Sequence, residues 1–347
     1  MPGNACAGSS CQALDPYLIV YNRIGKSGSE SLRTVISAAS KIHGFVHVKP
    51  SSFNVERSPA AQRRLVDSLL NISVRRRSRV LYSGHLRWID FSEFADPAEA
   101  AQVAYINMVR DPIRAVTSEF YWVPTRCGCN GPPARWCTPA FRARALLSCN
   151  DTLSARVLAG GHESVAHISL LHVIFLCGQL QHVGCNASIR EPGRPDVRRN
   201  VRRGPTAAAH RLPLGAQVAR ATEIAISSTL PRFAMVGVLD LFAETLETLA
   251  RVFPYFFGPP VDIARLASVY KNTNQATSAL APRELANEST LAVLMSPGSA
   301  FASEARLYNH VRQRFLCQAR ACGVQVSSPS DGNLRLGVGG WHPSLRG

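Results

Sequence analysis

Gly25, Lys26, Ser27 and Gly28 form a short loop whose residue types suit anion binding. Backbone N–H groups in a glycine-bearing loop point at a bound anion, and the unpaired N–H groups at the start of a following helix add partial positive charge. Lys26 supplies a full positive charge in the same place. The segment predicts a site for a phosphate-like group; the structural alternative is an ordinary turn with an exposed lysine.

Arg110 and Ser118 could form a second anion site. They are eight residues apart in the sequence, about two helical turns, so both side chains could contact one ligand. An arginine and a hydroxyl group would suit a second phosphate. The alternative is that Arg110 and Asp111 form an ordinary structural ion pair.

Two strand–loop–helix units must position these residues. Tyr17–Tyr21 and Tyr105–Val109 are apolar runs typical of buried strands. Ser29 is the expected N-cap of the helix after the first strand, and Asp111-Pro112 begins the helix after the second. Both anion-binding groups therefore follow the carboxyl end of a strand, where open α/β sheets bind their ligands.

Further strands and helices alternate along the chain. Strands are expected at Arg79–Ser83 and Phe233–Val238, and helices at Ala60–Leu70, Ser154–Phe175, Ala216–Ser228, Leu241–Phe253 and Phe301–Cys322. This alternation predicts an α/β fold with a P-loop-like, mostly parallel sheet and helices on both faces. The expected organisation is a lead at 1–16, one domain at 17–325 with a flexible insertion at 194–213, and a disordered tail at 326–347.

Gly25-Lys26-Ser27 reproduces the end of an ATP-binding Walker loop. That motif needs another glycine five residues before Gly25, and position 20 is Val20, inside the expected strand. The loop is therefore too short to wrap a triphosphate in the usual way. The loop therefore argues against a P-loop phosphotransferase, which we keep as a weaker alternative.

Several ordered segments together resemble a known enzyme family. They are YNRIGKSGS (Tyr21–Ser29), KIHGF (Lys41–Phe45), SGHLRWIDFSEF (Ser83–Phe94), INMVRDPIR (Ile106–Arg114), FLCG (Phe175–Gly178), REPG (Arg190–Gly193) and MVGVLDLFAETLETL (Met235–Leu249). The set resembles the sulfotransferases that use 3′-phosphoadenosine 5′-phosphosulfate. Within these it is most similar to the Golgi uronyl and heparan-sulfate 2-O-sulfotransferases, and the glycines of the loop look more like the uronyl branch. The resemblance implies the sulfotransferase fold.

The resemblance also implies a role for each candidate residue. Lys26 would stabilise charge on the leaving phosphate, and His85, which follows the strand Arg79–Ser83, would be the general base. The donor would be bound by Lys26, Ser27, Gly28, Ser29, Glu30 and Ser31 at its phosphosulfate and by Arg110 and Ser118 at its 3′-phosphate, with Lys271 closing over the nucleotide. Arg126 would lie on the acceptor side, and no metal is required.

Two residues depart from what the family pattern would favour. Glu30 places an acid beside an anion, which is tolerable only if its side chain points away. Ser83 stands where the heparan branch has a second histidine, which argues against a two-histidine mechanism. These departures favour an alternative, a catalytically silent glycan-binding relative. Should His85 be structural, the base would be sought among three further histidines, His43, His47 and His172.

The chain carries a formal net charge of +16, almost entirely from arginine. Such a charge predicts a polyanionic partner, and arginine makes bidentate contacts with sulfate, carboxylate and phosphate. With the resemblance, the expected acceptor is the 2-hydroxyl of a uronic acid in a sulfated or carboxylated polysaccharide of the chondroitin/dermatan or heparan type, and no nucleic acid. A coding bias towards arginine and alanine is the compositional alternative.

Ten cysteines and four N-x-S/T sequons favour a secretory lumen. Cys177 and Cys185 flank a short polar loop and, as in the family, are expected to form a local disulfide. Four other cysteines favour disulfides over a zinc site, because their spacing is not that of paired CxxC motifs: Cys127, Cys129, Cys137 and Cys149. The resemblance implies a type II membrane protein of the Golgi lumen, whose anchor is not expected within this chain.

Overall fold

The computed structural model describes residue 6 and residues 10–50, 58–124, 153–160, 171–178, 214–259 and 287–326. Within these residues five strands form one sheet in the order β2-β3-β1-β4-β5, and every neighbouring pair is parallel. The strands are β1 (Leu18–Asn22), β2 (Val46–Val48), β3 (Val80–Gly84), β4 (Val103–Val109) and β5 (Phe233–Val238). The predicted α/β fold with a parallel sheet is confirmed.

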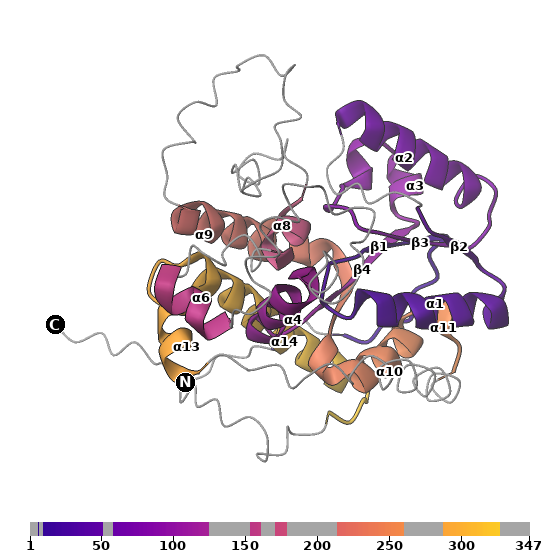
Figure 1. Ribbon diagram of the computed structural model, residues 1–347. Coiled ribbons are helices and arrows are strands. Elements are labelled where there is room, and N and C mark those ends of the chain that lie inside the picture. Colours follow the sequence, from indigo (N-terminus) through magenta and orange to yellow (C-terminus); the bar gives the residue numbers. More distant parts are fainter. Residues whose placement is uncertain are drawn as a thin grey trace.

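Helices cover both faces of this sheet. In Figure 1, α2 and α3 lie on one side of the strands, and α1, α10 and α11 lie on the other. The long helix α14 packs against β5 and α9. The helices run as follows: α1 (Ser29–His43), α2 (Pro59–Ile72), α3 (Pro97–Ala100), α4 (Pro112–Pro124), α6 (Leu153–Gly160), α8 (Leu171–Cys177), α9 (Leu214–Ile224), α10 (Phe242–Val252), α11 (Pro254–Phe257), α13 (Glu288–Leu294) and α14 (Ala300–Ala321).

The strands are apolar on both faces because both faces are covered. Every residue of β1 and of β3 is buried, as expected for parallel strands between two layers of helices. The two strands expected at Tyr17–Tyr21 and Arg79–Ser83 are present, each shifted by one residue. The short strand β2 was not predicted, because three residues carry too little pattern to identify a strand.

Helix α1 begins one residue earlier than the sequence predicted. Its N-cap is Gly28, in a left-handed conformation, and Ser29 is the first helical residue. The helix then buries Leu32, Val35, Ile36 and Ala39 on one face, the spacing of an amphipathic helix. The expectation of a serine N-cap is therefore wrong, because the loop needs a left-handed residue at this point.

The strand order reverses at the carboxyl ends of β1 and β4, the position of the crevice in open α/β sheets. The chain leaves β1 for the β2–β3 side of the sheet, whereas it leaves β4 for β5 on the other side. Ligands of open α/β sheets bind where the order of the strands reverses in this way. The loop after β1 and the start of α4 meet at that crevice.

Two disulfides join the segment before β1 to the end of α14. They pair Cys6 with Cys317 and Cys11 with Cys322, and neither pairing was predicted. Cys177 is also disulfide-bonded, and because the other described cysteines pair among themselves, its partner lies outside the described residues. The expected bond to Cys185 therefore stays a prediction.

Some expectations fall on residues that the structure does not describe. The insertion at 194–213 and the tail beyond residue 326 lie outside the described residues. The helix expected at Ser154–Phe175 is described only at its two ends, as α6 and α8. Among the described helices, none combines the length and apolar character needed to cross a bilayer.

Candidate functional site

The loop between β1 and α1 contains two residues in left-handed conformations, Lys26 (φ 56°) and Gly28 (φ 72°). A Cβ atom at Gly28 would lie 2.8 Å from Met108 Cε and would also collide with the side chain of Leu239. Both the backbone conformation and the space therefore require glycine at position 28. The loop is held closely against the carboxyl ends of β4 and β5.

Glu30 is paired with two arginines at the start of α1. Arg23 contacts one carboxylate oxygen, and Arg33 Nε donates to the other at 2.8 Å. Burial opposes ionisation of this carboxyl group, yet the two guanidinium groups hold the pKa of Glu30 below its usual range. The acid beside the expected anion site is thus compensated by cations from β1's end and from α1.

His85 follows β3, and its ring is fixed to the main chain of the loop after β1. Its Nδ1 lies 3.1 Å from the carbonyl oxygen of Arg23, and the backbone N–H of Arg23 donates to Gly84 at 2.8 Å. A carbonyl oxygen can only accept, so Nδ1 carries the proton and the basic lone pair of the neutral ring is on Nε2. Burial lowers the pKa of His85 to about 4, and the Arg23 cation adds to this effect.

Ser83 on β3 is hydrogen-bonded to a histidine from β2. Its Oγ lies 2.7 Å from His47 Nε2, while His47 Nδ1 lies 3.2 Å from Ser37 Oγ. Burial lowers the pKa of His47 to about 4, and the nearby Lys49 lowers it further. An imidazole therefore lies beside position 83 even though that position is a serine.

The two expected anion sites converge at the crevice. Arg110 Nη1 donates to the carbonyl oxygen of Lys26 at 3.3 Å, so the end of β4 lies against the loop after β1. Deeper between the strands, Asn107 Nδ2 donates to Asn22 Oδ1 at 2.8 Å. Ser118 is buried on α4, and its sharing of a ligand with Arg110 stays a prediction.

His172 on α8 joins the loop to the end of β4. Its Nε2 lies 3.0 Å from Ser27 Oγ and 3.3 Å from the backbone nitrogen of Arg110. Its Nδ1 lies 2.9 Å from Glu304 Oε2 on α14. Ser27, His172 and Glu304 are each at most 1% exposed. Sequence analysis identified His172 only as an alternative base. Its contacts with Ser27 and Glu304 could not be predicted, because these residues are far apart in the chain.

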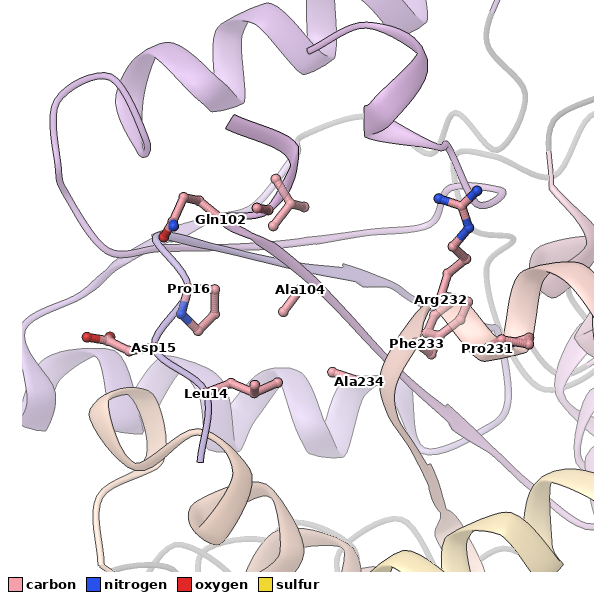
Figure 2. A pocket seen from close by; sticks show the side chains of 11 residues that line it. Leu14, Asp15, Pro16, Gln102, Ala104, Pro231, Arg232, Phe233 and Ala234 are labelled. Atoms are coloured by element: carbon pink, nitrogen blue, oxygen red, sulfur yellow. The ribbon is translucent and has the colours of Figure 1, made fainter. Parts of the chain in front are cut away.

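A pocket at the amino ends of the strands is separate from this crevice, which lies at their carboxyl ends. It has a volume of about 290 Å³ and is lined by residues at the amino ends of the strands, including Pro16, Val103 and Phe233. Figure 2 shows Asp15 and Arg232 on either side of it. Asp15 is already paired with Arg79 and Arg232 with Asp90, so the pocket presents no uncompensated charge.

We compared the chain with known protein families and with known proteins. No protein-family model matches the chain. The chain is 24% identical to the uronyl 2-sulfotransferase of Mus musculus over 328 residues, which are 90% of this chain and 66% of that protein. It is 29% identical to the heparan sulfate 2-O-sulfotransferase 1 of Xenopus laevis over 164 residues, 46% of this chain and 42% of that protein.

The chain is a relative of the uronyl and heparan-sulfate 2-O-sulfotransferases. The resemblance read from the ordered segments is thereby confirmed. A shorter match, 30% identical over 105 residues, is to the uronyl 2-sulfotransferase homolog pip of Drosophila melanogaster. The chain spans 66% of the length of the mouse relative, slightly less than two thirds.

The structure brings together one part of the predicted site. Lys26, Ser27 and Gly28 form the loop, Ser29 to Ser31 form the first turn of α1, and Arg110 contacts the loop directly. His85 is anchored to the same loop through Arg23. Lys271 and Arg126 lie outside the described residues. Within the part of the chain that is described, no group of three or more His, Cys, Asp or Glu side chains is arranged to hold a metal.

Proposed function

We propose that this chain transfers a sulfuryl group from 3′-phosphoadenosine 5′-phosphosulfate to the 2-hydroxyl of a uronic acid in a glycosaminoglycan. The observation that carries the proposal is the hydrogen bond between His85 Nδ1 and the carbonyl oxygen of Arg23. It fixes a neutral imidazole to the loop that contains Lys26. The named activities of the sequence relatives support the same reaction class.

Donor binding is assigned to the crevice at the ends of β1 and β4. Lys26 and the residues that follow it, Ser27 to Ser31, would bind the 5′-phosphosulfate through backbone N–H groups, with hydroxyl contacts from Ser29 and Ser31 rather than from the fully buried Ser27. Arg110, with Ser118, would bind the 3′-phosphate, and Lys271 would close over the nucleotide. The contact between Arg110 and the Lys26 carbonyl supports a single ligand that reaches both groups.

His85 is assigned the role of general base. In the proposed step its Nε2 takes the proton of the sugar hydroxyl as that oxygen attacks sulfur. A bond forms between the sugar oxygen and sulfur, and the bond from sulfur to the bridging phosphate oxygen breaks with its electron pair. Lys26 stabilises the negative charge on the departing 5′-phosphate. The products are a sulfated uronic acid and 3′-phosphoadenosine 5′-phosphate, with the proton left on His85.

The low pKa of His85 is compatible with this role. It keeps the ring neutral at neutral pH, which a base requires, although it also makes the ring a weak base. The negative charge of a bound donor would raise the pKa, because an opposite charge nearby favours the imidazolium. The base would therefore become stronger when the donor is in place.

The acceptor is proposed to be a polysaccharide of the chondroitin/dermatan or heparan type. The formal net charge of +16 supports a polyanion, and Arg126 would contact it. The two disulfides support an oxidising compartment, in agreement with a Golgi lumen. Binding of nucleic acid is not part of the proposal.

Sulfate transfer from radiolabelled donor to a panel of desulfated chondroitin, dermatan and heparan chains tests the proposal. Disaccharide analysis of the products is expected to place the label on the 2-position of a uronic acid. Label found only on hexosamine carbons would refute the uronyl assignment. Binding of the polymer without any transfer would favour a silent glycan-binding relative, and phosphoryl transfer from ATP would favour a P-loop phosphotransferase.

A further inference from the structure

Beyond the residues assigned to donor binding and proton transfer, three buried side chains form a chain of hydrogen bonds behind the loop. Ser27, His172 and Glu304 come from the loop, from α8 and from α14. We infer that His172 and Glu304 are a positioning pair, which holds Ser27 and the backbone at Arg110 in register so that both phosphates of one nucleotide can bind. The inference rests on the proposed function, since it concerns the same donor site.

The direction of the hydrogen bonds can be deduced from the donors present. The backbone N–H of Arg110 can only donate, so His172 Nε2 is the acceptor, at 3.3 Å. The ring proton is then on Nδ1, which donates to Glu304 Oε2 at 2.9 Å. The other oxygen of Glu304 accepts from the backbone N–H of Val173 at 3.0 Å. The carboxylate thus fixes both the orientation and the tautomer of the ring.

His172 Nε2 is consequently shared between the two anion sites. It accepts from Arg110 at the end of β4, and it lies 3.0 Å from Ser27 Oγ in the loop. The serine hydroxyl has a second acceptor, the carbonyl oxygen of Gly25, at 3.3 Å. Because Nε2 carries no proton, the Ser27 hydroxyl is the donor in the contact with the imidazole, and the Gly25 carbonyl is a longer, second acceptor within its reach.

A neighbouring contact of α14 repeats this arrangement. Tyr308, one helical turn after Glu304, donates to Asp240 Oδ2 at 3.3 Å. The same oxygen accepts the backbone N–H of Asp111 at 3.2 Å. Two successive backbone N–H groups after β4, those of Arg110 and Asp111, are thus each held by a side chain that α14 supports. The helix acts as a rigid support for the segment that would bind the 3′-phosphate.

The order serine, histidine, glutamate also matches a hydrolase triad, but burial excludes that role in this conformation. Ser27 is 0% exposed, so no acyl or phosphoryl substrate can reach its Oγ. A nucleophile must be accessible to the atom it attacks. The same burial excludes His172, 1% exposed, as the base that contacts a sugar hydroxyl.

The test compares two nucleotides that differ in one phosphate, 3′-phosphoadenosine 5′-phosphate and adenosine 5′-phosphate, by calorimetry on the full chain. The variants are His172→Ala, His172→Gln, which restores an acceptor, and Glu304→Gln. His310→Ala is the matched control, because His310 is an exposed histidine on the same helix as Glu304. Thermal melting reports whether each variant is folded.

Misalignment should weaken the ligand that uses both sites more than the ligand that uses one. In His172→Ala the dissociation constant of the bisphosphate is expected to rise about tenfold or more, by analogy with the loss seen when residues that orient the ligands of metal sites are removed. The dissociation constant of the monophosphate should change much less. We expect His172→Gln to recover part of the lost affinity for the bisphosphate, and His310→Ala to bind both nucleotides like wild type. If His172→Ala does not fold, His172→Gln and Glu304→Gln carry the same comparison.

Two outcomes would overturn the inference. Equal losses for both nucleotides would mean that the pair stabilises the fold without aligning the sites, and unchanged affinity for both would mean that it has no part in binding. The inference also predicts that Ser27→Ala combined with His172→Gln costs less than the sum of the single changes. Failure of the wild-type protein to bind either nucleotide would instead refute the proposed function, and the inference with it.

Discussion

His85 Nδ1 lies 3.1 Å from the main-chain carbonyl oxygen of Arg23, and this contact ties the carboxyl end of β3 to the loop after β1. It determines which ring nitrogen is basic, and it places that ring beside a buried guanidinium group. His85 and the loop that we propose to bind the donor are therefore not independent features of the sequence. A change in the loop is expected to alter the position of the base.

Removal of either expected phosphate-binding cation should weaken nucleotide binding. Lys26→Ala and Arg110→Ala each delete a charge-assisted contact, worth about 1.5–3 kcal/mol. Calorimetry with 3′-phosphoadenosine 5′-phosphate should therefore show dissociation constants raised by about tenfold or more. Arg64→Ala, an exposed arginine on α2, is the control for general charge loss. Unchanged affinity in both site variants would exclude this crevice as the donor site.

Gly28→Ala should destabilise the protein more than Gly44→Ala. Both glycines have φ 72°, so both substitutions carry the same left-handed backbone cost, about 1 kcal/mol. Only Gly28 is crowded, by Met108 and Leu239, whereas a Cβ at Gly44 would meet nothing within 4 Å. Urea unfolding of the two variants measures the difference. Equal destabilisation would show that the close approach at Gly28 is not needed.

The stability of the ligand-free protein should fall as the pH is lowered from about 6.5 towards 4. His47 and His85 have folded-state pKa values of about 4, below the value of about 6.5 of an unperturbed histidine, so the unfolded chain binds more protons in this window. Above the window both states are neutral and the effect is absent. Urea unfolding across this range should show a shallower pH dependence in His85→Gln and His47→Gln than in wild type. A slope that neither substitution changes would contradict the assigned pKa directions.

The sequence predicted the parts of the site that lie close together in the chain. Lys26, Ser27 and Gly28 share one loop, and the placement of Arg110 at a strand end followed from local pattern. The order of the strands in the sheet could not be predicted from local pattern, because parallel strands of similar apolar composition give no sequence signal for which strand pairs with which. The helix N-cap was misassigned because Gly28 must be left-handed for the loop to pack against β4, a tertiary requirement.

The supporting contacts were not predictable from the sequence. Ser27, His172 and Glu304 meet only because α8 and α14 pack behind the crevice. Glu30 looked unfavourable in the sequence because its ion pair with Arg23, which lies at the end of β1, could not be predicted. The disulfide partners Cys6 and Cys317 are 311 residues apart, and many pairings of ten cysteines are possible.

Polymer binding should be more sensitive to salt than nucleotide binding. Contacts between exposed arginines and a flexible polyanion are screened within about 10 Å at 0.1 M salt, whereas residues 25–29 of the proposed nucleotide loop are buried or half-buried. Arg126→Ala is expected to raise the Michaelis constant of the acceptor more than that of the donor. Kinetics at several salt concentrations check both statements. An equal effect of salt on both substrates would argue against an arginine-lined acceptor surface.

The central claim is that His85 is the base for sulfuryl transfer beside the donor site. The most direct measurement is the rate of sulfate transfer by His85→Ala, together with its affinity for 3′-phosphoadenosine 5′-phosphate. We predict a folded variant with nearly wild-type nucleotide affinity and a transfer rate lowered by at least about a hundredfold, the low end for loss of a general base. A transfer rate near that of wild type would contradict the account, and would make His85 a structural residue.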